Sequence, residues 1–387
     1  MTATNNNTSA GFSLLGGPLH RLGILMGLVR QGNTVRLGLF IGLFLWLVMV
    51  VLALIGGAGG PLFSLSLIGA HVRLLLVIPL MFISESVLDP RQTAFAAGLV
   101  RRGIVQEHQV AELEKIVTRV GRLKDSWLLE VICLAAALFL SFGVKLPDSA
   151  GVTGGFLPGE ATGGGVWAAW WYWAVCLTVF RFLLMRALSR IILWTYFLWR
   201  VSRLDLRLFA VHPDCVAGLG NLMLTQMQYL PLLVGFAVLR SAQFAEEIST
   251  GAMTFEATYP GIAVLLLFGF ILLAGPVMVF TPKLWRTRVD GLADYMAMAE
   301  DYVSQFDRKW VRSKQHSEPI LGTPDIQSLA DLSNSVQIVI KMRLAPVNGR
   351  MLTSVIGAVV LPMLPLLLFQ FPLTEIAKKL VTGLVGL

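Results

Sequence analysis

Hydrophobic and polar residues alternate along this chain in long blocks. Seven apolar runs each approach the ~20 residues that a helix needs to cross a lipid bilayer. Their bounds are Leu37–Gly56, Leu62–Ser84, Trp127–Val144, Val166–Ser189, Leu219–Leu239, Gly261–Thr281 and Met351–Phe371. We therefore predict an all-α fold, a polytopic transmembrane helical bundle of about seven spans.

The last of these runs contains two prolines, Pro362 and Pro365. Proline in a membrane helix frees backbone carbonyls that a neighbouring group must satisfy. Two predictions are therefore open for this run. It is either a seventh span that crosses the membrane or a re-entrant hairpin that returns the tail to the cytoplasm.

Two of the polar segments between the runs are too long to be simple connections. Apolar residues recur at helical spacing in segment 85–126 and in two stripes of segment 282–350. The positions are Val110, Leu113, Val117 and Val120, then Leu292, Tyr295, Ala299, Tyr302, Phe306 and Trp310, and finally Ile326, Leu329, Leu332, Val336 and Ile340. Because amphipathic helices bury their apolar faces, we expect these to pack on one another beneath the membrane or against a second subunit. The alternative is that they lie flat on lipid.

The composition excludes a soluble enzyme. The 387 residues are 56% hydrophobic and only 14% charged, and the mean hydropathy is +0.72. Soluble domains carry roughly 25% charged residues. Three cysteines are too few for a disulfide framework.

The distribution of the 31 Lys and Arg residues predicts topology rather than nucleic-acid binding. Most of them lie in the leader, after the fourth run, or in the two long polar segments. Because Lys and Arg are retained on the cytoplasmic side, we expect a cytoplasmic N-terminus. The predicted organisation is a leader (1–36), spans 1–2 (37–84), a cytoplasmic helical segment (85–126), spans 3–6 (127–281), a second cytoplasmic helical segment (282–350), and span 7 with the tail (351–387). The Gly-rich loop 145–165 is then outside, followed by an aromatic belt of Trp167, Trp170, Trp171, Tyr172 and Trp173.

The sequence contains no nucleotide-binding, kinase or hydrolase signature. The five histidines stand singly, so no zinc site is predicted. We expect no catalytic set, no metal and no cofactor, and an enzyme is the weaker expectation. Gly38 and Gly42, spaced as Gly-x-x-x-Gly, permit close helix packing.

The sharpest local motif is His212-Pro213-Asp214, followed by Gly218 and Gly220. One interpretation is structural: Pro213 sets a turn, Asp214 caps the fifth span, and the glycines allow close approach of backbone. The other interpretation is functional. His212 and Asp214 would form a proton- or cation-responsive site, because histidine titrates near physiological pH.

The segment Leu208–Asp214 has the form Leu-x-x-x-His-Pro-Asp, with Gly218-Leu219-Gly220 just after it. On these residues the chain resembles a family of uncharacterised bacterial membrane proteins. The resemblance extends to Arg122–Ser126, and to Met342–Val347 ahead of Leu361–Leu366. The family pattern has two adjacent glycines where this chain has Ala217-Gly218. The resemblance implies a bacterial inner-membrane protein and no particular activity.

Ionisable residues at membrane depth are costly and are functional candidates by default. Four lie near the inner ends of predicted spans and are expected to neutralise one another: Glu85, Glu130, Arg186 and Arg190. Arg73 and Arg181 fall nearer the midplane, with His71 close to Arg73. No Asp or Glu in any predicted span reaches that depth. We therefore expect these three residues to line a path or pocket for an anion.

Three function classes remain open. The first is an anion channel or transporter that uses the midplane arginines. The second is a membrane sensor or scaffold that signals through its cytoplasmic helices, and the third is a membrane-embedded enzyme for lipid or glycan substrates. The expected partners are membrane lipids, an anionic solute and further copies of the chain in a homo-oligomer, and no nucleic acid.

Labelling of single cysteines tests the predicted topology. In a background without the three native cysteines, cysteines at Ser149 and Thr250 should react with an impermeant thiol reagent in intact cells, because both loops are expected outside. Labelling at Ser313 instead would contradict this topology.

Overall fold

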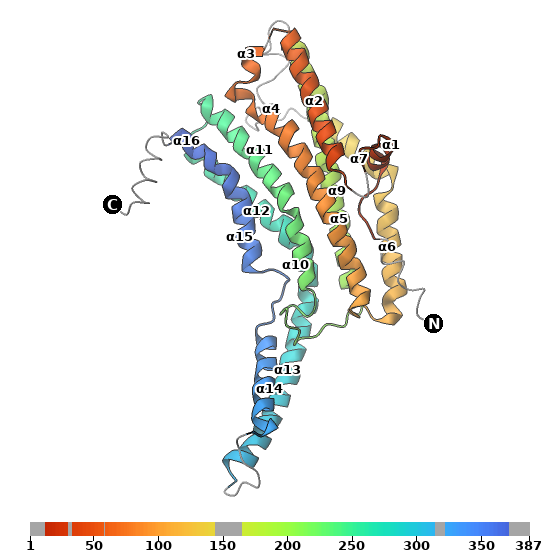
Figure 1. Ribbon diagram of the computed structural model, residues 1–387, viewed down its shortest axis with the longest axis vertical. Coiled ribbons are helices and arrows are strands. Elements are labelled where there is room, and N and C mark those ends of the chain that lie inside the picture. Colours follow the sequence, from red (N-terminus) through yellow and green to blue (C-terminus); the bar gives the residue numbers. More distant parts are fainter. Residues whose placement is uncertain (1–11, 30–32, 58, 144–164, 314–321, 371–387) are drawn as a thin grey trace, which may run out of the picture.

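The computed structural model describes residues 12–29, 33–57, 59–143, 165–313 and 322–370, and the regular elements in this part of the chain are helical (Figure 1). The α-helices are α1 (Pro18–Leu25), α2 (Val35–Ile55), α3 (Gly59–Leu62), α4 (Ile68–Val72), α5 (Ile78–Arg101), α6 (Val110–Lys124), α7 (Trp127–Leu138), α8 (Val166–Trp171), α9 (Leu177–Ser202), α10 (Gly220–Gln226), α11 (Leu230–Ser249), α12 (Tyr259–Ala274), α13 (Thr281–Phe306), α14 (Pro324–Ile340), α15 (Gly349–Met363) and α16 (Leu367–Gln370). The predicted all-α class is confirmed.

Short helical turns of other types join or flank these helices. Four are π-helical: η3 (Arg73–Val77), η5 (Phe139–Gly143), η8 (Tyr172–Cys176) and η12 (Asp307–Val311). The 3₁₀ turns are η2 (Leu65–Leu67), η4 (Glu107–Gln109), η9 (Met227–Tyr229), η10 (Glu256–Thr258), η11 (Gly275–Phe280) and η13 (Leu364–Leu366). Most of the expected outward loop 145–165, and the tail beyond Gln370, lie outside the described residues.

Five helical runs among the described residues are long and apolar enough to cross a membrane. They are Val35–Ile55, Ile68–Arg101, Gly220–Ser249, Glu256–Val311 and Gly349–Gln370. The pair Glu107–Lys124 and Trp127–Gly143, bent by 47°, would make a sixth. Five or six of the about seven expected spans are therefore found among the described residues. The expected fourth span, which begins at Val166, is not among them, and it combines a Trp-rich start with three arginines.

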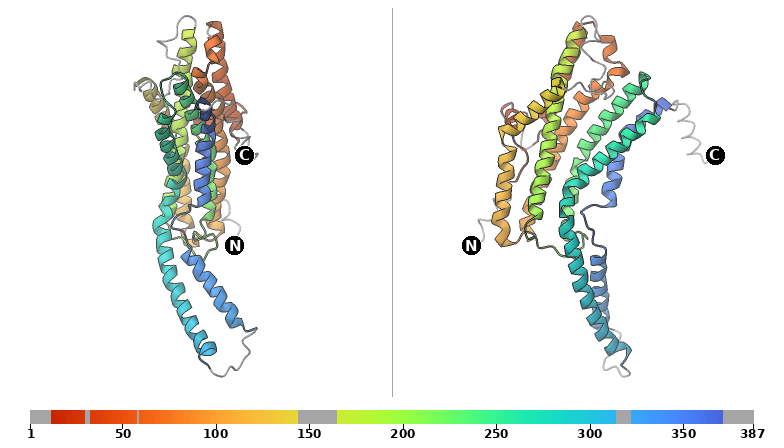
Figure 2. Two further views of the ribbon diagram at one scale, coloured as in Figure 1. Left: turned by 90° about the vertical axis from the view of Figure 1, so that its left-hand side faces the viewer. Right: turned by 180° about the vertical axis from the view of Figure 1, so that it is seen from behind.

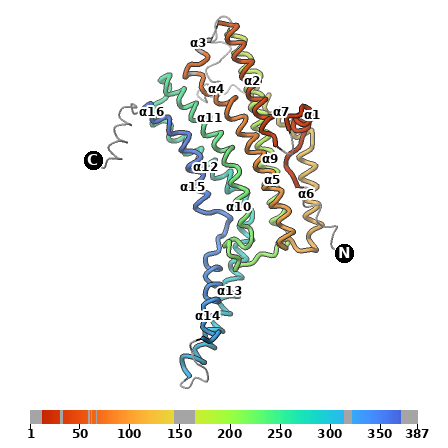
Figure 3. The backbone as a smooth tube through the Cα atoms, viewed as in Figure 1, coloured from red at the N-terminus to blue at the C-terminus, as the bar shows by residue number. Residues whose placement is uncertain are grey.

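The long helices lie side by side in an elongated bundle (Figures 1 and 3). α2 packs on α5, α5 also contacts α9 and α11, and α11 and α12 both pack on α15. Trp194, Phe82, Phe197 and Phe280 are among the large side chains that are fully buried between the helices. Because lipid is as apolar as the helices, such a bundle depends on close packing and on polar contacts.

A helical hairpin projects far beyond one end of the bundle (Figures 1 and 2). We call α13, η12 and α14 the arm. α13 continues directly from α12 through η11, so that Glu256–Val311 is one helical run of 56 residues. α14 packs back along α13, and the stripe that begins at Leu292 is half-buried between them. The two predicted amphipathic helices of segment 282–350 therefore do pack on one another.

The amphipathic helix of segment 85–126 has a different neighbour. α6 packs against α9, and Leu113 and Val120 are buried there. The run that begins at Val166 continues past Ser189 as α9 and ends at Ser202, after which the chain turns and Leu206 pairs with Val105.

The last helical run continues through Pro362 and Pro365 as far as Gln370. The described residues therefore favour a crossing span over a hairpin that turns back at the prolines. Residues 371–387, where the chain would return, lie outside the described part.

The two glycines of the Gly-x-x-x-Gly pattern let α2 approach its neighbours closely. A Cβ atom added at Gly38 would lie 2.6 Å from the Phe82 ring, and one at Gly42 would lie 2.3 Å from the carbonyl oxygen of Leu74. A side chain such as that of Phe82 can rotate away from an added methyl group, but the backbone carbonyl of Leu74 cannot. Gly42 therefore fixes how closely α2 and η3 approach.

We expect Gly42→Ala to lower the thermal unfolding midpoint of the purified protein, because the added methyl group would push α2 away from η3. Gly357→Ala in α15 is the matched control, since its Cβ would meet nothing within 4 Å. Alanine favours a helix over glycine by ~1 kcal/mol, so this control should not be destabilised. Equal midpoints for the two variants would contradict the close-packing role.

Candidate functional site

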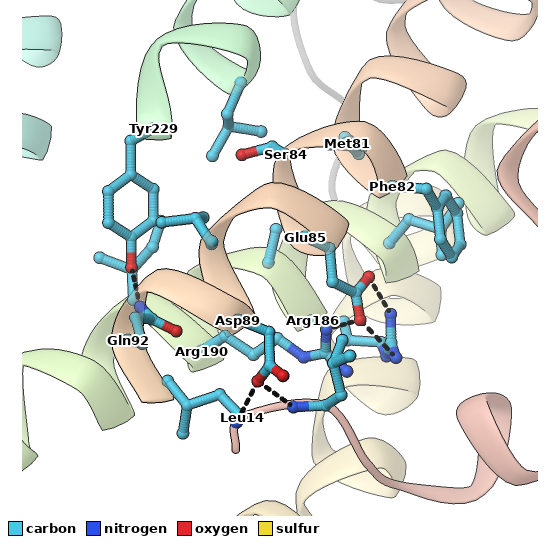
Figure 4. Close-up of a pocket in the computed structure, with 16 residues that line it drawn as sticks. Leu14, Met81, Phe82, Ser84, Glu85, Asp89, Gln92, Arg186, Arg190 and Tyr229 are labelled. Carbon is cyan, nitrogen blue, oxygen red and sulfur yellow. Dashed lines mark hydrogen bonds and ion pairs between the residues drawn. The ribbon is translucent and has the colours of Figure 1, made fainter. Parts of the chain in front are cut away.

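Three helices bring the four expected inner charges together, and Figure 4 shows three of these residues, Glu85, Arg186 and Arg190. Glu85 comes from α5, Glu130 from α7, and Arg186 and Arg190 from α9. Arg186 Nη1 lies 3.2 Å from Glu85 Oε2, and its Nε lies 3.6 Å from Glu130 Oε1. Arg190 pairs with Oε1 of Glu85. We call these residues the inner charge cluster; its members pair with one another, as the sequence led us to expect.

An extended part of the leader, residues 12–17, crosses this cluster, and we call it the leader strap. Asp89, one turn along α5 from Glu85, accepts hydrogen bonds from Ser13 Oγ and from the amides of Leu14 and Leu15 at 2.8, 2.7 and 3.1 Å (Figure 4). The carbonyl oxygen of Leu15 accepts a hydrogen bond from Lys124 Nζ at 3.0 Å, and that of Gly16 accepts one from Arg190 Nη2 at 3.2 Å. The strap is thus held largely by hydrogen bonds to its backbone, which its mostly apolar sequence does not reveal.

Between the strap, α5, α9 and the start of α11 lies a small cavity of about 50 Å³. Its polar lining includes Glu85, Asp89 and Arg190, and Gln92 donates to Tyr229 Oη at 3.1 Å (Figure 4). About 10–15 Å³ of such volume is enough to hold a water molecule. The cavity therefore has room for water, and the charged side chains around it join helices.

Arg73 is enclosed by the protein, with 1% of its surface exposed. Its Nη1 donates to Tyr172 Oη, and its guanidinium carbon lies 5.8 and 5.5 Å from the ring centres of Tyr172 and Phe180. Glu246 attracts this guanidinium electrostatically and accepts a hydrogen bond from the Gly69 amide at 2.7 Å. Arg73 therefore has partners from three other helical elements.

The prediction that no acid reaches the depth of Arg73 is wrong. The fifth span was expected to end at Leu239, whereas α11 continues to Ser249 and buries Glu246. A signal for this was present, because no glycine or proline follows Leu239 before Gly251. Tyr172, expected in the aromatic belt, is likewise buried between the helices.

Arg181 and His71 make separate contacts. Arg181 Nη1 donates to Ser141 Oγ at 2.8 Å. His71 Nδ1 accepts from Trp46 Nε1 at 2.8 Å, and its Nε2 lies 2.7 Å from the carbonyl oxygen of Leu62. Among the described residues, the three expected members of an anion path are thus not joined by direct contacts.

The buried arginine contacts coincide with π-helical turns. η3 begins at Arg73 and η8 at Tyr172, while η5 contains Ser141. A π turn inserts one residue into the helical repeat and is frequent at functional sites. Here the turns lie where a polar side chain must meet a partner on a neighbouring helix.

The carboxylate of Asp214 organises the loop between α9 and α10. It accepts hydrogen bonds from the amides of Val216, Gly218 and Gly220 at 2.9, 3.1 and 2.8 Å. Gly220 is the first residue of α10, whose N-cap position is Leu219. Asp214 therefore accepts a hydrogen bond from the first amide of α10, as predicted for a helix cap, although it lies five residues before the N-cap position Leu219.

The loop needs backbone conformations that favour glycine. φ is +55° at Cys215, +56° at Ala217 and +94° at Gly218. A non-glycine residue in the left-handed region costs ~1–2 kcal/mol, and Ala217 stands where the resembling family has glycine. The Asp214 hydrogen bonds hold the loop in this conformation.

Asp214 is charged at neutral pH. Burial by itself raises the pKa of the carboxyl, but the three backbone amides and nearby His212 outweigh it and hold the pKa below its ordinary value. His212 Nδ1 lies 2.9 Å from Asp214 Oδ1. The geometry therefore suits a helix cap. It also brings His212 and Asp214, which were considered as a proton-responsive pair, into contact.

The same loop connects the bundle to the arm, and we call residues 203–219 with Arg343 the arm joint. The Arg343 amide donates to Cys215 O at 2.8 Å, and Arg343 Nη2 donates to Asp214 O at 3.0 Å. On the bundle side, the Arg207 amide donates to Ile104 O at 2.8 Å. Sequence reasoning assigned no role to Arg343. The resemblance did include both Leu208–Asp214 and Met342–Val347, which the fold brings together.

Comparison of the chain with family models, with curated proteins and with solved structures gave no match. Within the described ranges, no group of three or more His, Cys, Asp or Glu side chains is placed to hold a metal ion. The candidate sites are therefore known from their own geometry alone.

We expect Asp214→Asn to lower the free energy of unfolding by ~1 kcal/mol and Asp214→Leu by more. Asn keeps one acceptor oxygen, whereas Leu leaves three amides without an acceptor, at ~1–3 kcal/mol for a buried group. Thermal unfolding in detergent measures the difference.

The pH dependence of this stabilisation has a defined sign. Because the folded pKa of Asp214 is lowered, its contribution is complete above the ordinary carboxyl pKa of ~4 and is lost as the pH falls through the folded value. The stability difference between wild type and Asp214→Asn should therefore be constant from neutral pH to about pH 5 and shrink in stronger acid. A difference that already shrinks between neutral pH and pH 5 would contradict this assignment to the Asp214 carboxyl.

Proposed function

We propose that the protein is a membrane-anchored sensor or scaffold that acts through its arm. The observation that carries this proposal is the unbroken helical run Glu256–Val311, which begins among the apolar spans and ends at the arm tip. A continuous helix is stiff, so a displacement within the bundle is passed to the arm.

The arm joint supports the same function. Arg343, which follows α14 in the chain, donates hydrogen bonds to the carbonyl oxygens of Asp214 and Cys215 in the loop. That loop also contacts Ile104 and Val105, which follow the end of α5, and α5 carries Glu85 and Asp89. Changes around the leader strap therefore have a route to the arm through one helix and one loop.

The arm also exposes apolar side chains suited to binding a helical partner. Val289, Met296 and Val303 are 48%, 46% and 51% exposed and recur every seven residues on α13. A seven-residue apolar repeat is the pattern of helices that pair with another helix. We take this stripe as the surface through which the arm binds a protein.

Anion transport, in a bacterial inner membrane with a cytoplasmic N-terminus, is the competing function. Its support is the burial of Arg73 and Arg181 in the bundle. However, Arg73 donates a hydrogen bond to Tyr172 and is attracted by the Glu246 carboxylate, and Arg181 donates to Ser141. Groups within the bundle therefore engage part of each guanidinium, which favours the sensor or scaffold.

Photocrosslinking from the arm tests the proposal. A photoreactive amino acid at Met296 or Val303 should form specific protein adducts in native membranes. At Asp294, which is exposed on the other side of α13, it should not. In parallel, proteoliposomes holding the wild-type protein should pass chloride, phosphate or a carboxylate no faster than empty vesicles.

Two outcomes would contradict the proposal. One is that no adduct forms, or that adducts form equally from Met296, Val303 and Asp294. The other is a protein-dependent anion flux that Arg73→Gln and Arg181→Gln reduce while the unfolding midpoint stays unchanged, which would favour transport instead.

A further inference from the structure

A basic groove lies beside the arm joint, on the outside of the bundle. It has a volume of about 520 Å³ and runs between the last turn of α9, η11 and the first turns of α13. Trp199 and Arg203 line one side, and Met278, Lys283 and Arg286 line the other. Its size exceeds by far that of the cavity at the inner charge cluster.

The charges lining this groove are all positive. Arg203, Lys283 and Arg286 contribute cationic groups, and no carboxylate is among the lining residues. Lys283 Nζ is engaged by Leu204 O and is attracted by Asp205 nearby. In the described part of the chain, the exposed Arg286 guanidinium makes no hydrogen bond or ion pair, so it is free to bind an anion.

The groove is also partly apolar. The Trp199 side chain is 42% exposed and carries the Arg203 guanidinium 5.4 Å from its ring centre, and Met278 is 48% exposed. Trp is enriched at the membrane–water boundary because one part of its ring system is apolar and the other polar. A ligand with both an anionic and an aliphatic part would match this lining.

The position of the groove along the helix fits the membrane boundary. α12 extends for roughly 24 Å at about 1.5 Å per residue, and the 3₁₀ helix η11 adds about 12 Å at about 2.0 Å per residue. Together they are long enough to cross the ~30 Å hydrocarbon core. Lys283 and Arg286 follow directly after this apolar stretch, so we expect them near the depth of lipid phosphates.

We propose that this groove binds the phosphate-bearing headgroup of an acidic phospholipid, with Arg286 as the principal phosphate ligand and Met278 and Trp199 against the acyl chain. Basic pockets between membrane helices bind acidic headgroups in this way, and guanidinium suits a phosphate through its planar pair of donors. The bound lipid would lie against both α9 and α13, where the arm leaves the bundle. This inference stands apart from the partner-binding role of the arm.

Native mass spectrometry of the full chain in mild detergent tests the lipid site. Titration with phosphatidylglycerol, phosphatidylcholine and free glycerol phosphate should show the tightest binding for phosphatidylglycerol. Arg286→Gln should weaken phosphatidylglycerol binding about fivefold, the effect of ~1 kcal/mol per basic residue near a lipid surface, and leave phosphatidylcholine binding unchanged. Arg350→Gln is the matched control, because Arg350 is an exposed arginine at the start of α15 that does not line the groove.

Three results would overturn the proposal. Equal binding of the two lipids would remove the role of headgroup charge. Glycerol phosphate that displaces phosphatidylglycerol at equal concentration would assign the groove to a soluble phosphate. An equal loss in Arg350→Gln and Arg286→Gln would mean diffuse surface attraction and no built site.

Discussion

The need to pair buried guanidinium groups governs the arrangement of this bundle. α9 carries Arg181, Arg186 and Arg190 among apolar neighbours, and an arginine without a partner at the bilayer centre costs ~2.5–3.5 kcal/mol. Each of the three has a partner on another helix: Ser141, Glu130 and Glu85. These contacts locate η5, α7 and α5 around α9. Removing one partner from such a pair leaves a buried charge and typically costs ~3–5 kcal/mol, so the arrangement is specific as well as stable.

Arg73 shows how the backbone adjusts to the same constraint. Its partner Tyr172 and its own position both begin π turns, so the helical repeat shifts where the two side chains meet. Glu246 approaches from a third helix and supplies the opposite charge. The Arg73 charge, which seemed to require an external anion, is thus attracted by a carboxyl group of the protein itself, which weakens transport as an explanation.

The arm depends on a different kind of contact. At the arm joint the hydrogen bonds are accepted by backbone carbonyl oxygens. Arg343 donates to the carbonyls of Asp214 and Cys215, and Lys283 donates to that of Leu204. Asp214 in turn holds that loop through three amides. The arm and the bundle are therefore coupled through one loop and one continuous helix, and the basic groove with Arg286 lies beside both. The proposed sensor or scaffold role needs such a coupling between the membrane part and the arm.

The sequence by itself determined the all-α class, the apolar spans and the amphipathic helices of the arm, because these depend on local periodicity and composition. It also predicted the pairing of Glu85, Glu130, Arg186 and Arg190, since depth along a span can be counted from residue numbers. Only the tertiary structure decided that Glu246 reaches Arg73, that the leader strap binds Asp89, and that Arg343 meets Asp214. These contacts join residues far apart in the chain. Their geometry depends on where helices end, bend and cross, which hydrophobic pattern does not encode.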